Sequence, residues 1–108
     1  MAKGFGGLGN LLKQAQEIQA RMAQIQEELA RRSVEASAGG GMVRVTVNGN
    51  LTLSSIKVDP GVVNPQEVEM LEDLILAAVN EGLRQARAMV SEEMSKATGG
   101  MKIPGLMP

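Results

Sequence analysis

A long, uninterrupted helical pattern near the amino terminus constrains the fold most strongly. Apolar side chains recur every three or four residues, at Leu8, Leu11, Ala15, Ile18, Met22, Ile25 and Leu29. This row, called the seam below, has the spacing of a heptad repeat. Asn10 is a residue type that favours the helix N-cap, so a helix is predicted from Asn10 to about Arg32, roughly 35 Å long. Because the seam is narrow, the helix is expected to pack against one partner helix.

A second long helix is predicted towards the carboxyl end of the chain. Asn64, Pro65 and Glu67 are typical of an N-cap and a first helical turn, and glycines after Thr98 would end the helix near Ala97. This helix would be roughly 50 Å long, whereas a compact globule of this chain length has a diameter of about 35 Å. Its apolar stripe comprises Val68, Leu71, Ile75, Ala78, Gly82, Ala86 and Met89. Gly82 would permit another helix to approach closely.

Three strands are predicted between the helices. Residues 33–38 form a weak candidate, and residues 42–47 a strong one, because valines alternate with polar residues. Asn48-Gly49 is a strong hairpin signal, leading into a third strand at residues 51–59. In that strand the apolar positions change phase, which predicts either a bulge near Ser54-Ser55 or burial of both faces.

The predicted fold class is therefore α+β, with a long helix, a three-stranded antiparallel sheet and a second long helix. We expect a flexible Gly-rich arm at residues 1–9, a single domain at 10–98 and a flexible tail at 99–108. The sheet is too small to cover the apolar stripe of the second helix, so two copies are expected to associate as a symmetric homodimer. The residues expected in the core or the dimer contact are Val45, Val47, Leu71, Ile75, Ala78 and Gly82.

The composition excludes most catalytic chemistry. The chain contains no His, Cys, Trp or Tyr and a single Phe. Disulfides, Cys or His zinc sites and His-based nucleophilic systems are therefore impossible. The acidic cluster of Glu67, Glu69, Glu72 and Asp73 is expected to stabilise the positive end of a helix rather than to hold a metal ion. No enzymatic activity, cofactor, metal or small-molecule substrate is expected.

Membrane association and secretion are not expected either. The longest apolar run, residues 74–79, is far shorter than the ~20 residues that span a bilayer. The amino terminus has no apolar segment of the kind found in secretory signals. The lack of Cys fits a cytoplasmic protein.

A glycine-rich string at residues 4–9 matches the spacing Gly-x-Gly-x-x-Gly. No predicted strand precedes it, so a dinucleotide site is not expected. The string is expected to be a mobile arm, and the alternative is that amides at a helix start meet a phosphate near Lys3 and Lys13.

Charge is distributed unevenly along the chain. Residues 1–57 contain seven basic and four acidic side chains, a net charge of +3, and residues 58–108 contain four basic and eight acidic, a net charge of −4. On an ideal helix Lys13 and Arg31 project to the same side, and Arg21 and Arg32 lie about 80–100° away. These cations predict either a phosphate-contacting surface or a solvated helix face. On the second helix Arg84, Arg87 and Lys96 would contact phosphates or stabilise the helix end.

Several short segments are distinctive in their order and spacing. They are GGLGNLLKQAQ at residues 6–16, VRVTVNG at 43–49, IKVDP at 56–60, EMLEDL at 69–74, AAVN at 77–80, and TGGM with IPG between 98 and 105. Together they resemble the YbaB/EbfC family of bacterial nucleoid-associated proteins, over essentially the whole chain.

This resemblance implies an intertwined homodimer whose helical arms project like tweezers. It also implies a cytoplasmic, nucleoid-associated protein that binds double-stranded DNA and influences gene expression. With Lys3 included from the amino-terminal string, the candidate DNA contacts are Lys3, Lys13, Arg21, Arg31, Arg32, Arg84, Arg87 and Lys96. Phosphate contacts are expected to dominate, because no motif for reading bases in the major groove is recognisable. The alternative is a module whose helical arms hold another protein without direct DNA binding.

Overall fold

The computed structural model describes the backbone of residues 2–97 and the side chains of residues 7–97. Along the chain its elements are α1 (Ala2–Arg31), β1 (Ser33–Ala38), β2 (Val43–Asn48), β3 (Leu53–Val58), the short 3₁₀ helix η1 (Pro60–Val62) and α2 (Val68–Ala97). The molecule measures 78 × 23 × 17 Å, with a radius of gyration of 20.7 Å. A compact domain of this size would have a radius of gyration of about 13 Å. The chain is therefore strongly elongated.

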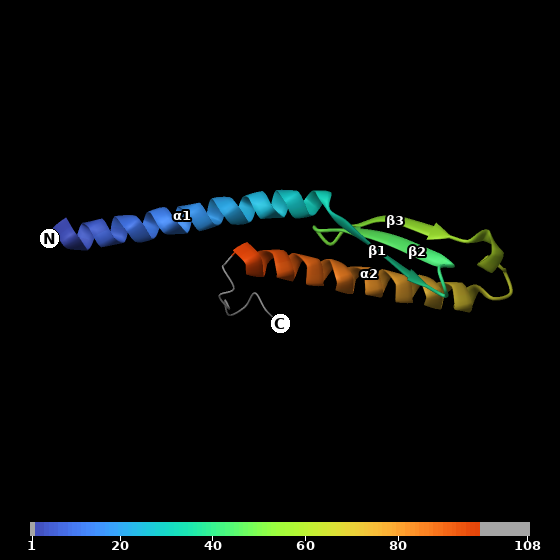
Figure 1. Ribbon diagram of the computed structural model, residues 1–108. Coiled ribbons are helices and arrows are strands. Elements are labelled where there is room, and N and C mark those ends of the chain that lie inside the picture. The colour runs from blue at the N-terminus through green and yellow to red at the C-terminus, as the bar shows by residue number, and fades with distance from the viewer. Residues whose placement is uncertain (1, 98–108) are drawn as a thin grey trace.

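The elements form two layers, which Figure 1 shows from the side. The three strands make one antiparallel sheet in the order β1-β2-β3. The helix α2 packs across one face of β1 and β2, and its carboxyl-terminal part contacts α1. In Figure 1, α1 and the sheet follow one another along the same side of α2, and α1 extends well beyond the end of α2. The predicted α+β fold, with two long helices and a three-stranded antiparallel sheet, is confirmed.

The core lies between the sheet and the middle of α2. Val43, Val45 and Val47 are at most 1% exposed, because alternating residues of a strand point to the same face. From α2, Ala78, Gly82 and Ala86 meet this valine row. Leu71, Leu74 and Ile75 are half-buried against it.

Gly82 explains how α2 approaches the sheet so closely. A Cβ atom built at this position would lie 2.9 Å from the Cγ2 atoms of both Val45 and Val47. Only a hydrogen fits there without displacing the valines. The expected close approach at Gly82 therefore exists, but its partner is the sheet and not another helix.

A bulge in β3 resolves the conflict of phase in that strand. Thr46 pairs with Ser55 and Val47 pairs with Leu53, so Ser54 has no opposite residue. The hydroxyl of Ser54 donates a hydrogen bond of 3.1 Å to the carbonyl oxygen of Thr46. Of the two alternatives left open by the sequence, a bulge near Ser54-Ser55 or burial of both faces, the structure shows the bulge. It places Leu53, Ile56 and Val58 on the same face of the sheet as the valine row.

The predicted start of the first helix is wrong, because α1 begins at Ala2 and not at Asn10. The backbone of residues 2–9, which we expected to form a flexible arm, is helical. Extending an existing helix needs no new nucleus, and each Gly costs only about 1 kcal/mol relative to Ala. The glycines therefore did not stop a helix whose apolar seam already includes Leu8.

The predicted start of the second helix is also wrong, by three residues. The side-chain oxygen of Asn64 accepts a hydrogen bond of 3.0 Å from the backbone N–H of Gln66. The carbonyl oxygen of Asn64 accepts another, of 2.9 Å, from the N–H of Glu67. These bonds close a separate turn, after which α2 begins at Val68. At the other end α2 is helical up to Ala97, the last described residue, so the predicted end of the helix and the tail predicted at 99–108 both lie outside what the structure describes.

Candidate nucleic-acid interface

The first half of α1 projects from the body of the molecule. Its seam is exposed there, with Leu11 64% and Ile18 50% exposed. Further along, Met22 and Ile25 are half-buried and Leu29 is buried. Within a single chain α2 therefore covers only the inner end of the seam. The exposed part of α1, from residue 7 to residue 21, is called the arm below.

The carboxyl-terminal end of α1 around Leu29, called the base of the arm below, is held by the turn between β2 and β3. The carbonyl oxygen of Leu29 accepts hydrogen bonds of 3.0 Å from the N–H groups of both Arg32 and Gly49. A Cβ atom on Gly49 would lie 2.1 Å from that same oxygen. Gly49 thus forms part of the predicted hairpin turn, and its lack of a side chain lets the end of α1 contact that turn.

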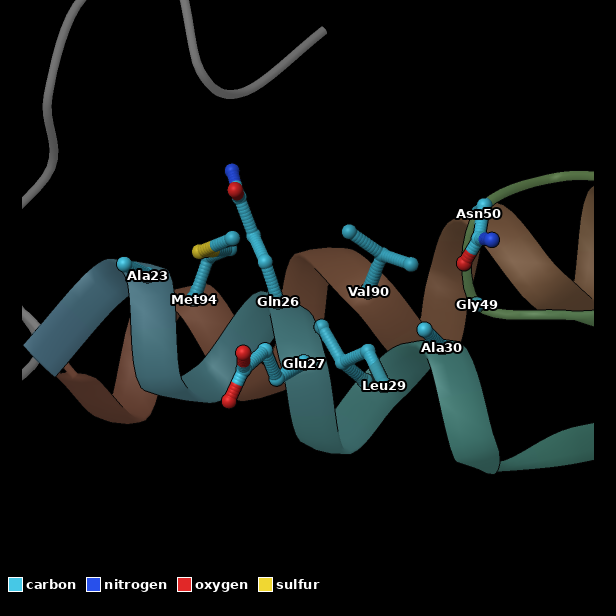
Figure 2. Close-up of a pocket in the computed structure, with 9 residues that line it drawn as sticks. All are labelled: Ala23, Gln26, Glu27, Leu29, Ala30, Gly49, Asn50, Val90 and Met94. Carbon is cyan, nitrogen blue, oxygen red and sulfur yellow. The ribbon is translucent and has the colours of Figure 1, made fainter.

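A cavity of about 460 Å³ lies beside this contact, between α1, α2 and the turn. Figure 2 shows Leu29 and Ala30 of α1, Gly49 and Asn50 of the turn, and Val90 and Met94 of α2 around it. Among the described residues, Glu27 is the only ionisable side chain in its lining. A single exposed carboxylate cannot provide paired acid–base chemistry, so this cavity offers no catalytic arrangement.

An ion pair links the base of the arm to α2. The guanidinium of Arg32 lies 3.0 Å from the carboxylate of Glu93, and Lys96 lies 3.4 Å from the same carboxylate. The hydrogen bond from Arg32, assisted by Lys96, holds the pKa of Glu93 below its ordinary value. Arg32 and Lys96, both predicted to contact DNA, are therefore already partly neutralised by the protein itself.

Arg84 is neutralised in the same way within α2. Its Nε donates a hydrogen bond of 3.0 Å to Oε2 of Glu81, and a second nitrogen bonds the other carboxylate oxygen. The hydrogen bond from Arg84 is the largest cause that lowers the pKa of Glu81 to about 2, and the hydrogen bond from Gln85 is the second. Conversely, Glu81 raises the pKa of Arg84. A phosphate would have to compete with this bidentate partner.

The remaining predicted cations are free of such partners. Lys13, Arg21, Arg31 and Arg87 are exposed and take part in no ion pair among residues 7–97. At 100° per residue, Lys13 and Arg31 lie about 160–200° around α1 from Leu29, on the side opposite the seam. Arg87 lies apart from them, beside an apolar groove on α2. The side chain of Lys3 lies outside the described side chains.

Two further cations were missed in the sequence. Arg44 of β2 and Lys57 of β3 are paired directly across the sheet, on its face turned away from α2. The alternation of residues 42–47 and the Asn48-Gly49 turn already placed both strands next to each other. The register could not be counted from the turn, because the bulge at Ser54 shifts it by one residue.

The described part of the chain offers no sign of other site classes. No group of three or more acidic side chains is close enough to hold a metal ion among the described residues. None of the described helices is long and apolar enough to cross a bilayer. What remains is a class of small α+β protein that displays basic side chains on a projecting helix and on an open sheet.

Comparison with known proteins places the chain within this class. Residues 4–101 match the YbaB/EbfC DNA-binding family, and the chain belongs to that family. This confirms the resemblance seen in the sequence motifs. A "Nucleoid-associated protein" of Moorella thermoacetica is 56% identical over 94% of this chain and 98% of its own length. Another protein of that name, from Syntrophobacter fumaroxidans, is 54% identical over 98% of this chain and 93% of its own length.

One solved structure supports the fold. The crystal structure of the uncharacterized protein HP0035 from Helicobacter pylori matches with a TM-score of 0.59, covering 79% of this chain and 93% of that one. Its sequence is 22% identical, so this likeness bears on the fold alone.

Proposed function

We propose that this protein is a nucleoid-associated DNA-binding protein of the cytoplasm. In this proposal it grips duplex DNA as a homodimer, mainly through phosphates, and thereby influences gene expression. Its membership of a DNA-binding family supports the proposal. The structural observation that carries it is the exposed arm, on which Lys13 and Arg21 have no acidic partner among the described residues. No enzymatic role is proposed.

Phosphate contact fits the chemistry of the arm better than base recognition. Lys and Arg on one exposed helix can each meet a phosphate without depending on sequence. Aromatic side chains that could stack on unpaired bases are missing from the chain except for Phe5. The protein is therefore expected to bind unrelated duplexes with similar affinity.

The proposed dimer follows from apolar surface that one protomer leaves uncovered. Leu53 and Ile56 lie on the α2 side of the sheet, yet they are 36% and 44% exposed because α2 packs over β1 and β2. Leu76 on α2 is 61% exposed. A second copy that places its own apolar residues here would cover this surface and present two arms together.

A salt titration tests the function. Fluorescence anisotropy with two unrelated labelled duplexes gives the affinity at several salt concentrations, and light scattering gives the mass. If about five phosphates are neutralised, the logarithm of affinity falls with the logarithm of salt at a slope near −4 to −5 for both duplexes. The mass is expected to be twice 11.4 kDa. A lack of binding at low salt, or binding that ignores salt, would contradict the proposal.

A further inference from the structure

The face of the sheet turned away from α2, called the open face below, is polar and uncovered. Strand pairing places Glu35 opposite Thr46 on this face, and Arg44 opposite Lys57. Arg44, Lys57 and Glu35 are all exposed. No helix of the described chain packs against this face. The helix α2 lies on the opposite face of the sheet, and α1 contacts α2 and the end of β2.

Arg44 and Lys57 form a pair of like charges that the sheet holds together. Residues directly opposite on antiparallel strands have Cβ atoms about 4.5–5.5 Å apart, and like charges at such positions destabilise the sheet. Neither cation takes part in an ion pair within residues 7–97. Such a pair is relieved when an anion lies against both side chains.

The neighbouring acidic groups leave the pair available. Asp59 lines the same shallow hollow of about 230 Å³, but its Oδ1 accepts a hydrogen bond of 2.8 Å from the N–H of Gly61. Glu35 sits diagonally from Arg44, beside Thr46, and pairs with no cation of the described chain. The Nε of Arg44 donates to the carbonyl oxygen of Gly41 at 3.3 Å, which leaves the terminal nitrogens free to meet an anion.

The open face and the cations of α1 lie on the same side of the molecule. The helix α2 contacts both the seam of α1 and the valine face of the sheet. Lys13 and Arg31, opposite the seam, therefore point away from α2, as Arg44 and Lys57 do. Figure 1 shows β1 following α1 along the long axis, and strand pairing places Arg44 beside Ser37 of β1 and opposite Lys57. The four residues therefore follow one another along the molecule, with Lys13 and Arg31 on α1 and then the pair on the sheet.

The length of this row decides what kind of anion fits it. Lys13 and Arg31 are 18 residues apart on α1, a rise of about 27 Å. Arg44 pairs with Ser37, about 13 Å along β1 from Ser33. The row is therefore more than ~40 Å long, whereas one turn of B-DNA measures about 34–36 Å. A free phosphate ion could touch only one end of it, but a duplex can follow its whole length.

We infer that duplex DNA bound to the arm continues onto the open face of the sheet, where Arg44 and Lys57 contact its phosphates. This inference rests on the proposed function and extends its contact surface beyond the helical arms. It assigns a role to a like-charge pair that the fold alone does not explain.

The test compares variants by the same salt titration of duplex binding. The double variant Arg44→Gln with Lys57→Gln should reduce the magnitude of the salt slope by about 1.8, since each lost phosphate contact contributes about 0.9. Near 0.1 M salt this corresponds to a loss of affinity on the order of 50-fold. The matched control, Arg44→Lys with Lys57→Arg, keeps both charges and should retain the wild-type slope.

Each outcome separates the inference from the function beneath it. If the wild type binds with a steep slope and the glutamine variant does the same, the open face does not contact DNA, and the proposed function stands. If the wild type does not bind, the proposed function itself fails. Failure of the charge-retaining control to bind like the wild type, while folded, also overturns the inference.

Folding is monitored by thermal unfolding of every variant. Removing two like charges should leave the melting temperature unchanged or raise it. If the double variant does not fold, Lys57→Gln alone on the edge strand provides the measurement, with an expected change in slope of about 0.9. Inorganic phosphate at matched ionic strength should not compete with the duplex more than chloride does, and strong competition would indicate a site for a compact anion instead.

Discussion

At the scale of single residues, close backbone contacts and short ion pairs decide what each side chain can do. Gly49 allows the end of α1 to meet the β2–β3 turn. Glu81 and Glu93 neutralise Arg84 and Arg32, which the sequence offered as DNA contacts. Of the predicted contacts whose side chains are described, those left available are Lys13, Arg21, Arg31 and Arg87. Basic residues in a sequence are therefore candidates, and their local acidic partners select among them.

Gly49→Ala is expected to loosen the base of the arm. The added Cβ would lie 2.1 Å from the carbonyl oxygen of Leu29, so the backbone must shift and its hydrogen bond to Gly49 must break. We expect the free energy of unfolding to fall by about 2–3 kcal/mol in urea denaturation. Gly9→Ala serves as the control, because a Cβ there meets nothing within 4 Å. Equal stability of the two variants would show that this contact does not hold the arm.

The ion pair between Glu81 and Arg84 predicts that the stability of the fold depends on pH in the acidic range. The pKa of Glu81 is about 2 in the folded protein against an ordinary value of 4.5, because Arg84 and Gln85 bond the charged form. The pair therefore stabilises the fold above about pH 4.5, and that contribution is lost as the pH falls towards 2. NMR titration of the Glu81 carboxyl carbon should give a midpoint near 2 in the wild type, and one shifted towards 4.5 in Arg84→Gln. A wild-type midpoint near 4.5 would mean that Arg84 is free for phosphates.

At the scale of elements, hydrophobic periodicity predicted both helices and the three strands, and the change of phase in β3 predicted a bulge as one of two alternatives. The beginnings of the helices were missed for physical reasons. Residues 2–9 of α1 are helical because a formed helix extends through glycines, and Asn64 closes a turn of its own before α2. Arg84 and Glu81 are three residues apart, a spacing at which side chains on one helix face meet, so this ion pair could have been predicted from the sequence but was not. The ion pair between Arg32 and Glu93 depends on how α1 packs against α2, and the spacing of residues in the sequence does not reveal that packing.

Reversing the charges of the arm is expected to weaken binding of duplex DNA. In the variant Lys13→Glu with Arg21→Glu, two phosphate contacts are replaced by repulsion, while both positions are exposed and the fold should persist. Affinity for a duplex near 0.1 M salt should fall by at least ~50-fold, measured by gel shift or anisotropy. The control Lys13→Arg with Arg21→Lys should bind like the wild type. Unchanged affinity after charge reversal would show that DNA does not contact the arm.

At the scale of the whole molecule, the elongated shape and the uncovered apolar surface lead to the same requirement. A single chain is 78 Å long, and its described residues form one small core between the valine row and the middle of α2. Leu53 and Ile56 lie beside that row on the same face of the sheet, on β3, whereas α2 packs over β1 and β2. The open face on the other side is polar and needs no cover. The arrangement therefore fits the proposed dimer with the second copy on the α2 side, which would leave the open faces to the proposed contact with DNA.

Ile56→Glu tests this arrangement without disturbing the protomer. Ile56 is 44% exposed in a single chain, so a glutamate there would remain solvated and cost little. If a second copy covers the position, the same charge becomes buried without a partner, which destabilises an interface by about 3–5 kcal/mol. Light scattering at micromolar concentration should then find a folded single subunit in place of a dimer. Ser37→Glu adds the same charge to the open face and should leave the mass at two subunits, because that face lies outside the proposed contact. A dimer that persists in Ile56→Glu would mean that the two copies contact each other elsewhere. If the wild type is itself a single folded subunit, the proposal that two arms bind DNA together is wrong.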